Sequence, residues 1–184
     1  MGLMTTLPRS RPLTRADLAS MPDDGHRYEL IDGVLIVTPA PGFQHQNVLA
    51  ELNDRLRAAC PRELVVLFAP FAVALADDTE LQPDLIVARR VDFTARELPV
   101  APLLAVEVLS PSTRRVDLTL KRDRLEEAGC GAYWCVDPTA LTLVAWELHD
   151  GRFVEVASVA GDDVFEASRP FPVTIRPSDL AGPC

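Results

Sequence analysis

Residues 101–109 constrain the fold more than any other segment, because they are apolar at almost every position. Alternate residues of a strand face opposite sides of its sheet, so a strand that is apolar on both sides must be covered on both faces. Glu107 is the exception, with aliphatic residues on either side of it. The segment predicts a central strand whose carboxylate is paired, protonated or bound to a metal ion.

The pattern of the remaining chain predicts a mixed α/β (α+β) fold. Two turn residues, Asp32 and Gly33, separate two β-rich runs and predict a hairpin near the N-terminus. Apolar residues recur at helical spacing over residues 43–60, and a second helix is expected over 115–128, ended by Gly129. Further strands are expected at residues 64–75 (bent at Pro70), 83–87, 133–136 and 171–175, and in a second hairpin at 141–148 and 153–159.

Composition indicates one domain that carries a negative net charge. A chain of 184 residues fits a single domain, and we expect a flexible arm over residues 1–13 followed by one domain over 14–184. The net charge of −9 argues against non-specific adhesion to nucleic acid or membranes, because both are polyanions. The chain shows no apolar run that could span a bilayer, no apolar signal segment and no CxxC pair. We therefore expect a cytoplasmic protein with reduced thiols.

Three polar residues fall at positions that the pattern predicts to be buried. Asp84 begins an otherwise apolar strand, Glu107 lies in the central strand, and Lys121 lies on the apolar stripe of the second helix. The other members of that stripe are Leu118, Leu125 and Ala128. Two carboxylates can hold Mg²⁺ or Mn²⁺, and a lysine can orient or deprotonate a water molecule or offset charge on a phosphate. The alternative is a set of buried ion pairs with a structural role.

Several short motifs run in the same order as in a known protein family. They are Tyr28-Glu-Leu-Ile-Asp-Gly33, His45-Gln46, Pro83-Asp84, Glu107-Val-Leu-Ser-Pro-Ser-Thr113, Asp117 with Lys121, and Tyr133-Trp134 with Asp137-Pro138. With these motifs the chain resembles the Uma2 family, within the PD-(D/E)xK nuclease superfamily, over about residues 14–160. The resemblance implies a restriction-endonuclease-like core, in which helices flank a mixed sheet and a metal site lies on neighbouring strands. The sequence adds a β-hairpin near each end of this core.

Residue by residue, the resemblance assigns Asp84 to the PD aspartate and Glu107 to the D/E position. Leu109 stands where the literal motif has its lysine, and Lys121 fits the place of a lysine displaced onto the following helix. Leu125 stands where a tyrosine is common, and the acidic residue that usually precedes the Tyr-Trp pair is missing. These departures leave the implied metal ligands in place and change residues close to them.

Five further residues are candidates for the site. Glu29 could add an acidic group near the metal, as the superfamily often does, or be an ordinary exposed strand residue. His45 could act in catalysis or be a buried capping residue, and Gln46 could contact substrate or cap the helix. Arg114 and Arg115 could bind the phosphodiester backbone. Their alternative is a solvated helix N-terminus, although cations there oppose the helix dipole.

Together these features favour a metal-dependent endonuclease that cuts DNA by in-line attack of water. Asp84 and Glu107 would bind Mg²⁺ or Mn²⁺, and Lys121 would position the nucleophile. The expected partner is nucleic acid, in particular DNA, with no membrane, and a homodimer would suit double-strand cleavage. A different class of function remains open, namely a catalytically weak or silent module that binds nucleic acid or protein through the same fold.

Overall fold

The computed structural model describes residues 10–181, and its N-terminal hairpin forms at the predicted Asp-Gly turn. Strand β1 (Arg27–Ile31) pairs antiparallel with β2 (Val34–Thr38), and Asp32 and Gly33 both adopt positive φ, at 51° and 73°. The hairpin belongs to a five-stranded sheet in the order β2-β1-β5-β4-β7. The remaining strands of this smaller sheet are β4 (Ala72–Ala76), β5 (Thr79–Leu81) and β7 (Glu97–Leu98).

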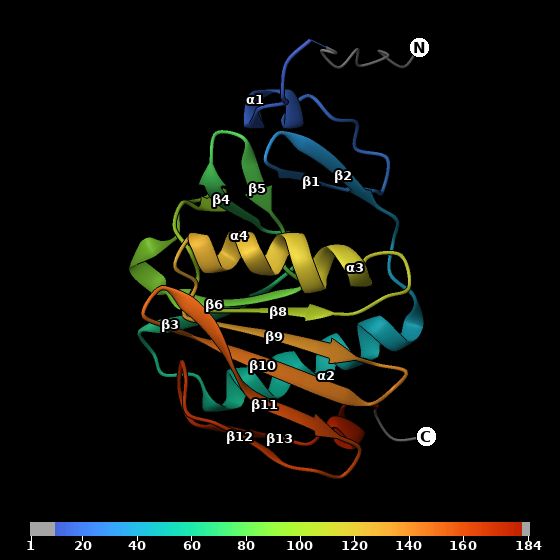
Figure 1. Cartoon of the computed structure of the whole chain (residues 1–184), viewed down its shortest axis with the longest axis vertical. Helices are drawn as coiled ribbons and strands as arrows, with labels where there is room; N and C mark the ends of the chain where they lie inside the picture. Colours follow the sequence, from blue (N-terminus) through green and yellow to red (C-terminus); the bar gives the residue numbers. More distant parts are fainter. Residues whose placement is uncertain (1–9, 182–184) are drawn as a thin grey trace.

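A second, six-stranded sheet has the order β11-β10-β9-β8-β6-β3 (Figure 1). Its strands are β3 (Leu64–Phe68), β6 (Leu85–Arg89), β8 (Leu104–Val108), β9 (Ala132–Asp137), β10 (Thr142–His149) and β11 (Arg152–Ala160). Strands β8 and β9 are parallel, and the other neighbouring pairs are antiparallel. Strand β8 is central and every one of its residues is buried, which confirms the prediction from its apolar pattern.

The two faces of the larger sheet are covered by different elements. Leu104 and Val106 of β8 pack on one face with the apolar residues of α2 (Phe43–Ala59). Ala105, between them, packs on the other face with Leu125 of the second helix and Ile31 of the hairpin. Glu107 shares the parity of Ala105, so its side chain is directed into the space between the two sheets.

The helix predicted over residues 115–128 forms in three parts, seen between the two sheets in Figure 1. They are α3 (Arg114–Val116), a π-helical turn η2 (Asp117–Lys121) and α4 (Arg122–Glu127). Lys121 and Leu125 face the core as predicted, whereas Ala128 is exposed. Asp117, four residues before Lys121, is buried on the same side of the helix.

Other predictions need correction at the level of single elements. The strand expected over residues 64–75 is divided at Pro70 into β3 and β4, which belong to different sheets. A proline cannot donate a ladder hydrogen bond, and here the chain leaves one sheet for the other. The predicted tail strand forms as β13 (Val173–Ile175) and pairs with β12 (Phe165–Ala167), a strand that was not expected. The short helices are α1 (Arg15–Leu18), η1 (Arg90–Asp92) and η3 (Pro177–Ala181).

The ends of the chain bear on the predicted domain boundary. Residues 1–9 of the predicted arm lie outside the described residues. The next residues contact the hairpin, since the Leu13 main-chain N–H donates to the Gly33 carbonyl at 3.0 Å. The division into an arm and a single domain stays a prediction. Within residues 10–181, no helix has the length and apolar character needed to cross a membrane.

Candidate active site

Three buried acidic side chains come from the two sheets. Glu29 lies on β1, Glu107 lies on β8, and Asp84 directly precedes β6, which pairs with β8. Alternation places Glu29 on the same side of β1 as the buried Ile31, so it faces the larger sheet. All three are buried, with at most 2% of each residue exposed. The structure therefore excludes the alternative that Glu29 is an ordinary exposed strand residue.

Lys121 lies at the centre of an acidic cluster. Its Nζ lies 3.0 Å from Glu29 Oε2, 3.1 Å from Glu107 Oε1 and 3.4 Å from Asp117 Oδ1. The other carboxylate oxygen of Glu29 accepts a hydrogen bond from the Gln82 main-chain N–H at 2.7 Å. The lysine side chain is 2% exposed, so these carboxylates, rather than water, stabilise its charge. We call Glu29, Glu107, Asp117 and Lys121 the lysine cluster.

Asp84 is held by a second set of partners next to the lysine cluster. Its Oδ1 accepts a hydrogen bond from Arg27 Nη1 at 2.8 Å, and its Oδ2 lies 3.0 Å from His45 Nε2. Oδ2 also accepts a hydrogen bond from the Val108 main-chain N–H at 2.9 Å. The last contact joins Asp84 to the residue that follows Glu107. The predicted residues thus lie together, but the direct side-chain partners of Asp84 are Arg27 and His45 rather than Lys121.

The two groups differ in how readily they bind protons. Burial acts to raise the pKa of Asp84, but the hydrogen bond from His45 and the charge of Arg27 outweigh it and hold that pKa well below its ordinary value. Burial raises the pKa of Glu107 well above its ordinary value, although Lys121 acts in the opposite direction. Burial acts to lower the pKa of Lys121, but the surrounding carboxylates outweigh it and the pKa is raised. Lys121 is therefore an ammonium group and a hydrogen-bond donor at neutral pH.

The charge balance of the site suits a divalent cation. Four buried carboxylates (Glu29, Asp84, Glu107 and Asp117) lie around two permanently charged side chains, Arg27 and Lys121. The formal excess of two negative charges and the oxygen ligands match Mg²⁺ or Mn²⁺. As arranged, residues 10–181 contain no group of three or more His, Cys, Asp or Glu side chains placed to hold a metal. Lys121 Nζ contacts one oxygen of Glu29 and one of Glu107, so a cation bound to those two oxygens would require Lys121 to move away from them.

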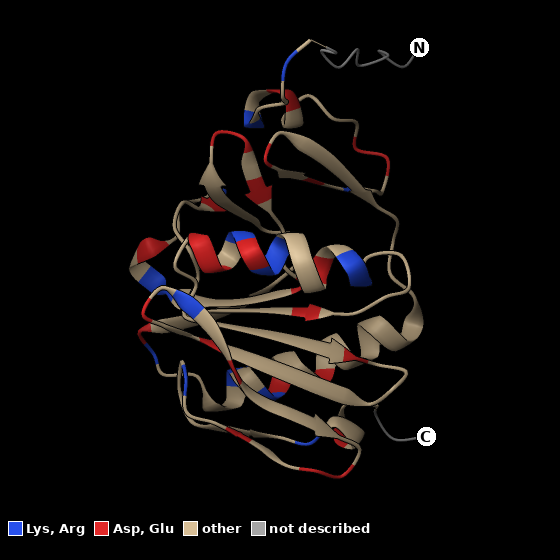
Figure 2. Ribbon diagram, in the orientation of Figure 1, with Lys and Arg blue, Asp and Glu red and all other residues tan. Residues whose placement is uncertain are grey.

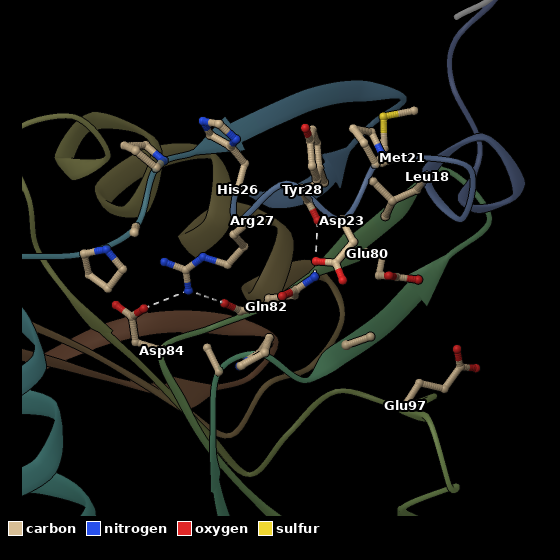
Figure 3. Close-up of a pocket in the computed structure, with 18 of the residues that line it drawn as sticks. Leu18, Met21, Asp23, His26, Arg27, Tyr28, Glu80, Gln82, Asp84 and Glu97 are labelled. Atoms are coloured by element: carbon tan, nitrogen blue, oxygen red, sulfur yellow. Dashed lines mark hydrogen bonds and ion pairs between the residues drawn. The ribbon is translucent and has the colours of Figure 1, made fainter. Parts of the chain in front are cut away.

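A cavity of about 730 Å³ opens beside Asp84 (Figure 3). Its lining includes Arg27, Tyr28, His45, Gln46 and Asp84. In Figure 3 the Arg27 side chain extends across the cavity between Asp84 and Gln82, whose carbonyl accepts a hydrogen bond from Arg27 at 3.0 Å. Gln46 is exposed, whereas His45 is buried with its Nδ1 unbonded by any residue from 10 to 181. Asp84 and His45 thus form the buried wall between the lysine cluster and this cavity.

The two arginines predicted to bind substrate lie at the start of the second helix. Charged residues of both signs follow each other along this helix in Figure 2. Arg114 forms an ion pair with Asp137 while remaining half exposed. Arg115 is exposed. Neither arginine lines the cavity, and their contact with substrate stays a prediction.

Two residues of the site were not among the predicted site residues. Arg27 has the strand parity of Glu29, and Asp117 precedes Lys121 by four residues on the same helical face, so both could have been found from spacing. A stronger signal is composition, since Lys121 is the only lysine among the 18 basic residues of the chain. The single lysine of a chain that otherwise uses arginine lies in the buried acidic cluster.

Comparison with known proteins agrees with this architecture. The chain is similar over 92% of its length to a crystal structure described as a putative nuclease belonging to DUF820 from Anabaena variabilis ATCC 29413. The TM-score is 0.73, the identity is 18%, and 98% of that chain is covered, so the likeness concerns the fold and confirms the predicted fold class. No curated protein is significantly similar in sequence. A family model described as Uma2, putative restriction endonuclease, matches residues 15–180. Because that match includes nearly the whole chain and all of the site, the chain belongs to the Uma2 family.

Proposed function

We propose that this protein is a metal-dependent nuclease of the PD-(D/E)xK kind that hydrolyses phosphodiester bonds in DNA. The observation that carries the proposal is the buried excess of carboxylates between the two sheets, beside the only lysine of the chain and next to a cavity. Membership of a family described as putative restriction endonucleases supports the same reaction class. The resulting enzyme would act in the cytoplasm on nucleic acid, and a pair of subunits would suit cleavage of both strands.

In this proposal Asp84 and Glu107 hold Mg²⁺ or Mn²⁺, with Glu29 close enough to complete the acidic set. The bound cation would act as a Lewis acid and lower the pKa of a bound water. Arg27 and His45 keep the Asp84 carboxylate ionised and fix its orientation through their contacts of 2.8 and 3.0 Å. A cation held by Glu107 would favour its ionised form and so oppose the burial that raises its pKa.

Lys121 acts as a fixed positive charge in this scheme. Its raised pKa favours the protonated form, which suits orienting water or offsetting charge on the phosphate. His45 lines the cavity and, through Asp84, would act on the metal side of the site, and its buried Nδ1 has no partner within residues 10–181. Gln46, Arg114 and Arg115 would contact the substrate backbone, since the net charge of −9 requires that DNA be bound by a local set of donors.

A second candidate is a catalytically silent binding module, favoured by the pairing of every site carboxylate. Asp84 is bonded to Arg27 and His45, and the other three carboxylates contact Lys121. A closed ion cluster of this kind can serve the structure alone. The two candidates differ in their need for a divalent ion, which is measurable.

The test is nicking of supercoiled plasmid in Mg²⁺ or Mn²⁺ by the wild type, Asp84→Ala and Lys121→Met. Glu166→Gln, which changes an exposed carboxylate on β12, is the matched control. Cleavage by the wild type and the control that both site variants and a chelator abolish, with folding retained, would support the nuclease. Equal cleavage by all four proteins would identify a contaminant and refute the assignment. Absence of cleavage with retained DNA binding would favour the silent module.

A further inference from the structure

The ammonium group of Lys121 is shared among carboxylates from three different elements. Glu29 lies on β1, Glu107 on β8, and Asp117 on the same helical turn as Lys121. Only the contact with Glu107 has hydrogen-bond geometry. Glu29 Oε2 and Asp117 Oδ1 accept no hydrogen bond from any residue between 10 and 181. Lys121 therefore has one directional partner and two partners at ionic contact distance.

A divalent cation on Glu107, as proposed above, would compete with Lys121 for that directional partner. The lysine side chain is 2% exposed, so solvent cannot replace a lost carboxylate. A buried charge left without a counter-charge is strongly destabilising. Glu29 is itself a candidate neighbour of the cation. Asp117 is the carboxylate of the cluster that can stay with the lysine.

The position of Asp117 suits this task. Asp117 and Lys121 are the first and last residues of η2, so one helical turn sets their relative position, whereas Glu29 and Glu107 lie on strands. The main-chain carbonyl of Asp117 accepts a hydrogen bond from Tyr133 Oη at 2.8 Å, which fixes the turn to β9. Wide helical turns of this type often occur at functional sites. The turn thus presents a lysine together with its own counter-charge.

We propose that Asp117 is a positioning residue that holds the Lys121 ammonium in the site when Glu107 and Glu29 turn to a divalent cation. The inference rests on the proposed metal-dependent function. Without the cation, Lys121 serves as the internal counter-ion of the cluster. With the cation, Lys121 shifts from Glu107 to Asp117 and keeps its charge next to the reacting groups.

The single lysine makes this shift directly observable. Lysine labelled with ¹⁵N at Nζ gives one side-chain ammonium signal in NMR, and that signal survives only while the group is protected from solvent exchange. We expect the wild-type signal to move on addition of Mg²⁺ and to stay protected. In Asp117→Asn the signal should be present without Mg²⁺ and be lost with it. Asp123→Asn, an exposed carboxylate on the same helix, is the control and should behave like the wild type.

Each alternative result has a distinct meaning. A wild-type signal that ignores Mg²⁺ would refute the proposed cation site and this inference with it. If Asp117→Asn responds to Mg²⁺ as the wild type does, the role of Asp117 is refuted and the proposed cation site is not. The same holds if the lysine signal of Asp117→Asn is already lost before Mg²⁺ is added. Should Asp117→Asn fail to fold, the wild type still decides: in Mg²⁺ the ammonium protons must keep nuclear Overhauser contacts with Asp117 while those with Glu107 weaken. The reverse pattern would overturn the proposal.

Discussion

Replacement of Lys121 by methionine should destabilise the protein by an amount that grows with pH. The lysine contacts three carboxylates at 3.0, 3.1 and 3.4 Å. At an effective dielectric constant of about 20, each contact corresponds to roughly 5 kcal/mol of gross attraction. The net loss is smaller, because carboxylates deprived of the lysine can bind protons instead. Neutralising one glutamate of ordinary pKa 4.5 at pH 7 costs about 3.4 kcal/mol. We therefore expect a loss of about 3–5 kcal/mol at pH 7.

The sign of the pH dependence follows from the raised pKa of Glu107. A carboxyl group with a raised pKa binds more protons in the folded than in the unfolded state, so its contribution to stability is lost as pH rises. Lys121 opposes this shift, and its removal raises the pKa of Glu107 further. The loss of folding free energy caused by Lys121→Met should thus increase by about 1.4 kcal/mol per pH unit for each proton that the folded variant binds in addition to those of the folded wild type.

Urea unfolding followed by the fluorescence of Trp134 and Trp146, at several values between pH 5 and 8, measures both quantities. The double variant Lys121→Met/Glu107→Gln is the internal control, since it removes a carboxylate together with its cation. The double variant should be more stable than Lys121→Met at pH 8, and the two should have nearly the same stability at pH 5. A loss below about 1 kcal/mol at pH 7, or a penalty independent of pH, would contradict the reasoning, because breaking a buried pair should cost more.

Three further predictions concern the surroundings of the site. Tyr133→Phe removes the hydroxyl that bonds the Asp117 carbonyl at 2.8 Å, and urea unfolding should show a loss of about 1 kcal/mol; an unchanged midpoint would mean that η2 needs no such anchor. Gly131→Ala would place its Cβ 2.7 Å from the Leu103 carbonyl oxygen, so thermal unfolding should reveal a loss of about 1–3 kcal/mol as β8 and β9 separate locally; equal melting temperatures would argue against this close approach. Burial raises the pKa of Cys130 to about 12 and also raises that of Cys135, so mass spectrometry after iodoacetamide treatment of the native protein at pH 8 should find both unmodified; rapid labelling of either would indicate local opening.

The sequence reveals the parts of the site that depend on simple periodicity. A glutamate within an apolar strand and a lysine on an apolar helical stripe are visible in the pattern, and the structure brings Glu107 and Lys121 to 3.1 Å. Pairing between distant segments is not encoded in any local period. Spacing places Arg27 on the same face of its strand as Glu29, but its pairing with Asp84, like that of His45, depends on how the hairpin and α2 pack against β6.

For the fold as well, the sequence predicts the elements that form locally better than the pairing of distant segments. The Asp32-Gly33 hairpin forms as expected, because a two-residue turn fixes its own pairing. Residues 64–75 form a continuous apolar run, which predicts a single strand. In the structure Pro70 divides the run into two strands of different sheets, and the sequence pattern does not show that two sheets are involved. The π-helical turn is also invisible to a pattern search, since Asp117 and Lys121 share a face at ordinary helical spacing too.

The buried position of the only lysine gives the protein a built-in proteolytic reporter. A protease that cleaves after lysine has one target bond within the chain, between Lys121 and Arg122, in the middle of the second helix. Native-state cleavage at that bond requires the helix to open, so its rate measures the free energy of local unfolding at the site. Any ligand that binds the closed form should slow this cleavage in proportion to its occupancy, even if no reaction takes place. A gel that follows one band turning into two would then detect ligands of the site without knowledge of the substrate.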